Sequence, residues 1–271
     1  MFDILKYLPF ALLFIVFSCN SPAKKENNKT LNDPKKGRFI SQKFGGCDTL
    51  TNQGVSVVVH VWEPVDSSEA AERTKNIIAE KVINRINSYA DSASLASNPA
   101  AKTSIKAASD VFSANYQSFK KEFPDSPGCW EVEVTGDTVM MTDHVLLYQF
   151  DHYAFTGGAH PNSFRSYHIF DLDTGNETEV QTFVSDTVAL LKKVELAFRK
   201  EEKLDGNADL EEAGYFLADH QFFMPANYTF TRTGVFFYYN PYEIAAYVRG
   251  PISFTIPYSD LEGIVKKDLI F

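Results

Sequence analysis

Residues 129–134, Cys129-Trp130-Glu131-Val132-Glu133-Val134, decide the fold class of this chain. Trp130 and the two valines alternate with Cys129 and the two glutamates, which is typical of a half-buried β-strand. Thr135-Gly136-Asp137 follows as a hairpin signal, and residues 145–153 and 167–170 have the composition of further strands. The stretch therefore predicts an antiparallel sheet in the middle of the chain.

Helical patterns flank this region on both sides. Apolar residues recur at spacings of three and four in three stretches, as in amphipathic helices. These stripes are Ile78, Val82, Ile86 and Tyr89; Ile105, Ala108, Phe112, Phe119 and Phe123; and Val184, Val188, Leu191, Val194 and Phe198. Strand hairpins are expected over 39–62 and 228–239, a last strand over 252–256, and a short helix over 261–269. Because strands and helices are partly segregated, we predict an α+β fold with mostly antiparallel sheets and packed helices.

The first 38 residues have a different composition from the rest. An apolar run from Tyr7 to Phe17 ends at Ser18-Cys19. It is shorter than the roughly 20 residues that span a membrane and has the length of a signal-peptide core. The pattern looks like a bacterial lipoprotein signal, the alternative being a buried N-terminal helix. We expect residues 1–18 to be removed after export, Cys19 to carry a membrane-anchoring lipid outside the cytoplasm, and residues 19–38 to form a flexible tether.

The folded part is acidic. The first 38 residues hold seven basic and three acidic side chains, which leaves 19 basic and 32 acidic ones beyond them, a net charge of −13. Nucleic acid is an unsuitable partner, because its binding requires a basic patch. An acidic body suits a cationic partner, or serves solubility alone.

Two cysteines, Cys47 and Cys129, remain once Cys19 is assigned to lipidation. Outside the cytoplasm such a pair can form a disulfide. The alternative is two buried free thiols, and the sequence leaves both open.

The densest cluster of unusual residues lies at 152–161, His152-Tyr153-Ala154-Phe155-Thr156-Gly157-Gly158-Ala159-His160-Pro161. Two adjacent glycines allow positive φ, and the backbone N–H groups that they expose can hold an anion or a sugar hydroxyl. Tyr153 and His160 add a stacking group and a titratable group. The alternative is a plain Gly-Gly corner between two strands. In a second cluster, 236–244, most aromatic residues are expected in the core, whereas Tyr242 and Glu243 follow Pro241 and are expected to be exposed.

Three motifs together carry a family resemblance. Residues 153–161, then Asp171-Leu172-Asp173-Thr174-Gly175, then Tyr239-Asn240-Pro241-Tyr242-Glu243-Ile244 resemble the RsiV/PdaC-type extracytoplasmic module from about Phe39 onward. The resemblance implies two intimately joined α+β subdomains, a PdaC-like one over 39–150 and an RsiV-like one over 151–271. It also implies likeness to a lysozyme-sensing anti-sigma-factor ectodomain and to the accessory part of peptidoglycan deacetylases.

The chain departs from the family at two points. Ala246 stands where members often have proline, and no Thr-Phe-Asp-Asp run supplies deacetylase chemistry. The resemblance therefore implies architecture and cell-envelope location rather than deacetylation.

Other chemistries have weak support. Residues 169–174 mimic a haloacid-dehalogenase motif without the later acidic pair. The alternate spacing of Asp205, Asn207, Asp209 and Glu211 is like that of a calcium loop, but the glycine at loop position six and the glutamate at position twelve are missing. The four histidines at 144, 152, 160 and 168 lack a compact zinc spacing. We therefore expect no metal and no cofactor.

The sequence favours a non-catalytic, lipid-anchored envelope module that recognises a secreted, lysozyme-like protein or a glycan. The candidate contact residues are Tyr153, Gly157, Gly158, His160, Pro161, Tyr242 and Glu243. The alternatives are a glycan-acting hydrolase that uses His160 with an unidentified carboxylate, and a purely structural envelope lipoprotein.

Overall fold

The computed structural model describes residues 36–48, 50–126 and 128–271. The expected signal peptide, Cys19 and nearly all of the expected tether lie outside the described residues. The first strand begins at Gly37, and Arg38 within it forms an ion pair with Glu63 at 2.8 Å. None of the described helices combines the length and the apolar character that crossing a bilayer requires.

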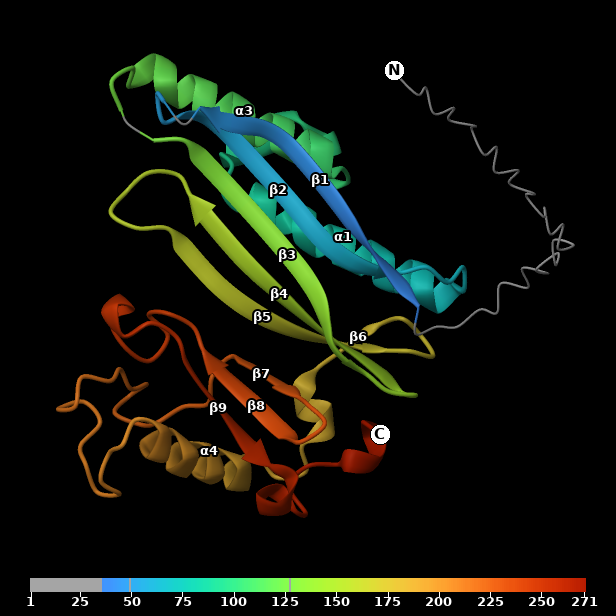
Figure 1. Ribbon diagram of the computed structural model, residues 1–271, viewed down its shortest axis with the longest axis vertical. Helices are drawn as coiled ribbons and strands as arrows, with labels where there is room; N and C mark the ends of the chain where they lie inside the picture. The colour runs from blue at the N-terminus through green and yellow to red at the C-terminus, as the bar shows by residue number, and fades with distance from the viewer. Residues whose placement is uncertain (1–35, 49, 127) are drawn as a thin grey trace, which may run out of the picture. The chain divides into compact units, whose positions relative to one another are not determined.

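A mixed sheet of six strands, in the order β1-β2-β3-β4-β5-β6, forms the N-terminal part of the described chain (Figure 1). Its strands are β1 (Gly37–Asp48), β2 (Gln53–Pro64), β3 (Trp130–Met141), β4 (Val145–Phe155), β5 (Asn162–Asp171) and β6 (Glu177–Thr178). β2 and β3 pair in parallel, because a helical segment separates them in sequence, and the other neighbours pair antiparallel. The predicted α+β class with mostly antiparallel pairing is confirmed.

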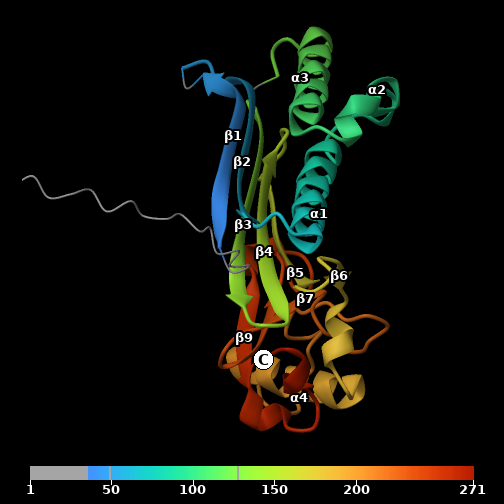
Figure 2. The ribbon, with the colours of Figure 1, turned by 90° about the vertical axis from the view of Figure 1, so that its right-hand side faces the viewer.

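Helices cover one face of this sheet (Figure 2). The helices between β2 and β3 are α1 (Glu69–Asn87), α2 (Ser92–Ser97), the 3-10 turn η1 (Pro99–Lys102) and α3 (Ile105–Glu122). Ser68 and Ser104 cap α1 and α3, since each side-chain oxygen accepts a backbone N–H three residues on. Ile78 and Phe112 are buried against alternate residues of β2 to β4. In Figure 2 no described element lies over the opposite face of β1 to β3.

A second, three-stranded antiparallel sheet holds the C-terminal core (Figure 1). Its strands are β7 (Asn227–Phe230), β8 (Gly234–Tyr239) and β9 (Ile252–Pro257), preceded by η2 (Val180–Phe183) and α4 (Thr187–Glu201), with η3 (Tyr247–Arg249) between β8 and β9. Leu147 of β4 and Ile169 of β5 belong to this second core, whereas Leu146 and Phe170 belong to the first. Alternate residues of β4 and β5 thus serve both cores, and the predicted division between residues 150 and 151 falls within β4.

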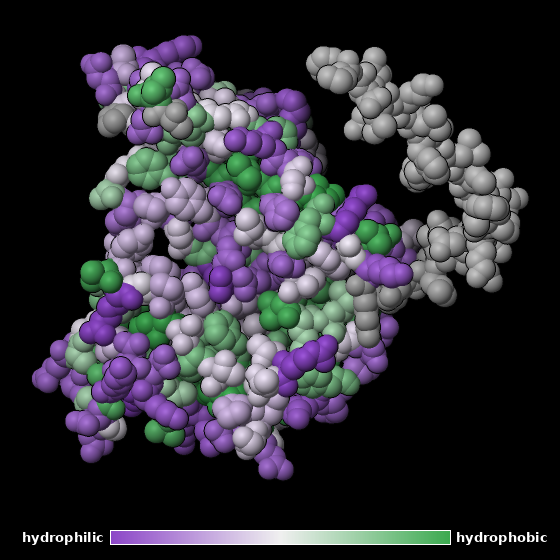
Figure 3. All heavy atoms as spheres, in the orientation of Figure 1, coloured by the Kyte–Doolittle hydropathy of each residue, from purple (hydrophilic) through white to green (hydrophobic). Residues whose placement is uncertain are grey.

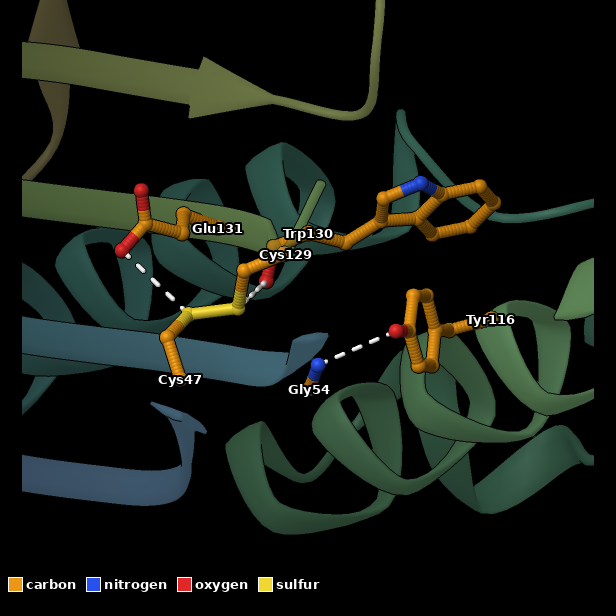
Figure 4. The surroundings of a disulfide bond; sticks show 6 residues. All are labelled: Cys47, Gly54, Tyr116, Cys129, Trp130 and Glu131. Carbon is orange, nitrogen blue, oxygen red and sulfur yellow. Dashed lines mark hydrogen bonds between the residues drawn. A yellow bond between two sulfur atoms is a disulfide. The ribbon is translucent and has the colours of Figure 1, made fainter. Parts of the chain in front are cut away.

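A disulfide joins Cys47, near the end of β1, to Cys129, just before β3 (Figure 4). The two Cα atoms are 5.7 Å apart. Beside it, Tyr116 of α3 accepts a hydrogen bond from the backbone N–H of Gly54 at 3.0 Å. The disulfide connects the edge strand β1 to β3 across the beginning of β2.

Two local predictions were wrong. Gly136 makes no hairpin turn, because β3 continues through it to Met141. A side chain at this position would begin 2.5 Å from the hydroxyl of Tyr148, which donates to the carbonyl of Trp62 at 2.7 Å, so the glycine is a packing requirement. The helix expected over 261–269 is replaced by the 3-10 turns η4 (Tyr258–Leu261) and η5 (Lys267–Leu269), separated by Gly263 at φ +74°.

Candidate functional site

A cleft of about 520 Å³ opens where the uncovered face of the large sheet meets the C-terminal part. Figure 3 shows the surface hollowed at this junction. The sheet side contributes Glu133, Thr135, Asp151, His152, Tyr153, Ser163 and Phe164; the C-terminal side contributes Tyr238, Pro241, Tyr247, Gly250 and Pro251. Strand alternation places Glu133 and Thr135 opposite Tyr153 and Asp151 on the uncovered face. His152 and its partner Phe164 alternate with these residues and border the cleft from the helix-covered face.

A second hollow of about 310 Å³ adjoins the cleft and shares Ser163, Pro241 and Tyr247 with it. It is also lined by His160, Pro161, Asn162 and Tyr242. The structure thus gathers four of the sequence-predicted contact residues in adjoining hollows, namely Tyr153, His160, Pro161 and Tyr242.

His160 is held between two tyrosines. Its ring stacks on Tyr247 with a centroid distance of 4.1 Å and an interplanar angle of 11°. Nδ1 donates to the carbonyl of Pro161 at 3.2 Å, and Nε2 lies 3.0 Å from the hydroxyl of Tyr242. Among the described residues, both ring nitrogens of His160 therefore contact oxygens that are not carboxylates.

The two loop glycines have the expected backbone. Gly157 and Gly158 take φ values of +99° and +106°, and no atom lies within 4 Å of where a side chain would begin on either. Neither lines the two hollows. They border open space, where the backbone can be approached closely.

Glu243 was expected to be an exposed contact residue, but its carboxylate is used inside the protein. Its two carboxylate oxygens accept the backbone N–H groups of Ala226 at 2.6 Å and Asn240 at 2.7 Å. Glu243 therefore holds the turn together. The preceding Tyr242 is 55 % exposed and takes φ +69°, a left-handed conformation that costs a non-glycine residue about 1 kcal/mol and needs surrounding structure to maintain it.

Asn240 connects the C-terminal part to the edge of β5. Its Oδ1 accepts the backbone N–H of Arg165 at 2.6 Å, and its Nδ2 donates to the carbonyl of the same residue at 2.9 Å. The amide thus pairs with β5 as a neighbouring strand would. This residue was quoted in the sequence motif, but nothing local indicated that its amide would reach a strand 75 residues earlier.

The cleft has an excess of negative charge. Asp151 is balanced by Arg165, whose Nε lies 2.7 Å from its Oδ1, and it also accepts from the Gln149 amide at 2.6 Å. Within the described ranges no hydrogen bond or ion pair engages the carboxylate of Glu133. Partial burial, followed by the charges of Glu131 and Glu133, raises the pKa of Tyr153.

Comparisons with known proteins agree with this two-part architecture. Residues 65–163 match a family described as deacetylase PdaC, and residues 183–259 match a family described as a protein of unknown function, DUF3298. No curated protein matches the chain.

Two crystal structures show the same fold. A DUF3298 family protein from Pseudomonas aeruginosa PAO1 is 20 % identical, with a TM-score of 0.60 over 88 % of this chain and 97 % of that one. A member from Bacteroides fragilis NCTC 9343 is 17 % identical, with a TM-score of 0.63 over 85 % of this chain and 93 % of that one.

These matches define an α+β protein with a PdaC-like segment followed by a DUF3298-like segment. The chain is thus similar to PdaC over residues 65–163 and to DUF3298 over residues 183–259, and the predicted PdaC likeness is confirmed. The cleft lies between the two matched segments: Glu133, Thr135, Asp151 and Tyr153 come from the first, and Tyr238, Pro241, Tyr247 and Gly250 from the second.

Proposed function

We propose that this chain is a recognition module that binds a glycan in the cleft between its PdaC-like and DUF3298-like parts. The observation that carries the proposal is the lining of that cleft, which combines three tyrosines, Tyr153, Tyr238 and Tyr247, with Glu133. The carboxylate of Glu133 has no hydrogen-bond or ion-pair partner among the described residues. Sugar rings present C–H faces that stack on aromatic side chains, and hydroxyls that bond to phenols and carboxylates. Recognition without catalysis also fits His160, whose nitrogens are both engaged.

Oligosaccharides of N-acetylglucosamine and soluble peptidoglycan fragments should bind the full chain in a calorimetric titration. Tyr247→Ala should weaken the binding about tenfold, since it removes one stacking surface worth roughly 1 kcal/mol beyond its area. Phe216→Ala is the matched control, because Phe216 is an exposed aromatic residue that does not line the cleft. Absence of saturable binding at millimolar concentration would reject the glycan ligand.

A cationic, lysozyme-like secreted protein is the second candidate ligand. The net charge of −13 beyond residue 38 favours it, because complementary charge speeds and orients association. Glu133 adds to this argument, since it lines the cleft and its carboxylate has no partner among the described residues. In the same titration at low salt, hen lysozyme should release or absorb heat. Glu133→Lys should weaken this binding more than Glu122→Lys, which makes the same charge change at the exposed end of α3. No heat with lysozyme leaves the glycan as the ligand.

We also propose that the module is exported and anchored to the bacterial membrane by lipid on Cys19. The apolar run before Cys19 supports this location, and so does the Cys47–Cys129 disulfide, since such bonds persist in oxidising compartments. Intact-mass analysis of the native protein should find a mature chain that starts at an acylated Cys19. An unmodified chain with its initiator methionine would contradict the anchor.

A further inference from the structure

A chain of polar side chains lies on the helix-covered face of β5 and contacts His152, which also lines the cleft. Ser166 and His168 are two residues apart on the strand and therefore point to the same face. Ser166 Oγ lies 3.0 Å from His168 Nε2, and His168 Nδ1 lies 2.5 Å from Glu177 Oε1 on β6. Lys81 of α1 contacts the other oxygen of Glu177 at 2.7 Å. The order hydroxyl, imidazole, carboxylate is the one found in serine hydrolases.

A second histidine fixes the direction of these hydrogen bonds. His152 of β4 is 7 % exposed, its Nε2 lies 3.3 Å from Ser166 Oγ, and its Nδ1 is buried with no hydrogen-bond partner in the described part of the chain. Burial, followed by the positive charge of Arg85, lowers the pKa of His152 to about 3, so its ring is neutral and carries one proton. That proton lies on Nε2, because only there does it meet an acceptor, Ser166 Oγ.

This assignment also fixes the positions of the protons on Ser166 and His168. Since Ser166 Oγ accepts from His152, its own O–H donates to His168 Nε2, and His168 Nδ1–H donates to Glu177. Burial opposes ionisation of Glu177, but hydrogen bonds from His168 and Lys81 outweigh it and lower the pKa of Glu177 to about 2. The carboxylate therefore stays charged near neutral pH and holds His168 in the tautomer whose Nε2 is free to accept a proton.

We propose that Ser166, His168 and Glu177 form a nucleophilic triad that hydrolyses a small carboxylic ester. Ser166 Oγ would attack the ester carbonyl carbon while its proton passes to His168 Nε2. His168 then returns that proton to the departing alkoxide, which leaves as an alcohol. Water, deprotonated by His168, next cleaves the acyl–Ser166 bond, releasing the acid and restoring the serine. Ser166 and His168 are the catalytic residues, and Glu177 is a positioning residue that acts through His168.

The surroundings favour a small substrate and a developing negative charge. Ser166 is half-buried, so a compact acyl group such as acetyl fits better than a bulky one. His152 Nε2–H donates to Oγ and stabilises the oxygen as it loses its proton. Arg85 lies over the Phe164 ring at 3.9 Å, and Phe164 stacks on His152 at 4.4 Å, which brings a positive charge to the same face.

Labelling with a fluorophosphonate probe tests the proposal directly, because such probes react with activated serines. The full chain should acquire one adduct, located by peptide mapping on Ser166, and should hydrolyse 4-nitrophenyl acetate. No adduct on the folded wild-type chain, or an adduct on a different serine, would overturn the triad, and this result requires no variant.

Variants separate catalysis from structure. Ser166→Ala and His168→Gln should lower the ester hydrolysis rate by about 10² to 10⁴, to the level of buffer. Ser118→Ala, an exposed serine on α3, should keep the full rate. Glu177→Gln should lower the rate about 10²-fold and change the pH at which it rises, because His168 loses its fixed tautomer. Equal hydrolysis rates for folded Ser166→Ala and the wild type would show a structural hydrogen-bond chain only.

Discussion

Replacing Cys47 and Cys129 together by alanine should lower the free energy of unfolding by about 4 kcal/mol in the chain-entropy account of disulfides. The bond joins residues 82 apart in sequence, so the unfolded chain loses much conformational freedom when it is closed. β1 is an edge strand with mostly exposed or half-buried residues, so few buried side chains hold it besides its pairing with β2. Urea unfolding followed by circular dichroism measures the change.

The single variants provide the control for this prediction. Cys47→Ala and Cys129→Ala should each cost nearly as much as the double variant, because either one opens the whole loop. Reduction of the wild-type protein should have the same effect. If both thiols titrate in the denatured, unreduced protein, or if the two single costs simply add, the stabilisation does not come from the bond.

Local periodicity predicted the elements whose burial depends on near neighbours. The alternation at 129–134 became β3, and the hairpin expected over 228–239 became β7 and β8. The helix expected from Val184 begins only at Thr187, and Val188 is exposed while Leu190 is buried, since α4 packs at a slightly different rotation. The sequence therefore predicts whether a segment is a helix or a strand better than it predicts which of its residues are buried.

Long-range packing decided what local patterns could not. The turn signal at Gly136 was overridden because the Tyr148 side chain occupies the space beside it. The parallel pairing of β2 with β3 depends on how α1 to α3 cross the sheet, which no single window of sequence contains.

The sequence likewise predicted some residues of the candidate site and missed others. The sequence motifs identified four residues that do lie in the two adjoining hollows, namely Tyr153, His160, Pro161 and Tyr242. Glu133 and Tyr247 were missed, because a glutamate on the exposed face of a strand and a tyrosine in a loop become notable only once the C-terminal part lies against the sheet.

Asn240→Ala should lower the free energy of unfolding by about 2 kcal/mol, because it leaves two half-buried backbone groups of Arg165 without partners. It should also weaken glycan binding about tenfold, roughly 1.4 kcal/mol, since Pro241 and Tyr242 follow Asn240 directly and lose their fixed position beside His160 and Tyr247. Thermal or urea unfolding measures the first effect, and calorimetric titration measures the second.

Asn240→Asp separates the two hydrogen bonds, because a carboxylate of the same shape still accepts from the Arg165 N–H but cannot donate to its carbonyl. We expect it to lose at least as much stability as the alanine variant, about 2 kcal/mol, because its second oxygen then faces the Arg165 carbonyl oxygen without a proton between them. Asn207→Ala, on an exposed loop, controls for the change of residue type. Equal stability and affinity in the Asn240 and Asn207 alanine variants would mean that the two parts are held together by their shared apolar core alone. In that case Leu147 and Ile169, which reach from the large sheet into the C-terminal core, would be the residues that keep the cleft closed on one side.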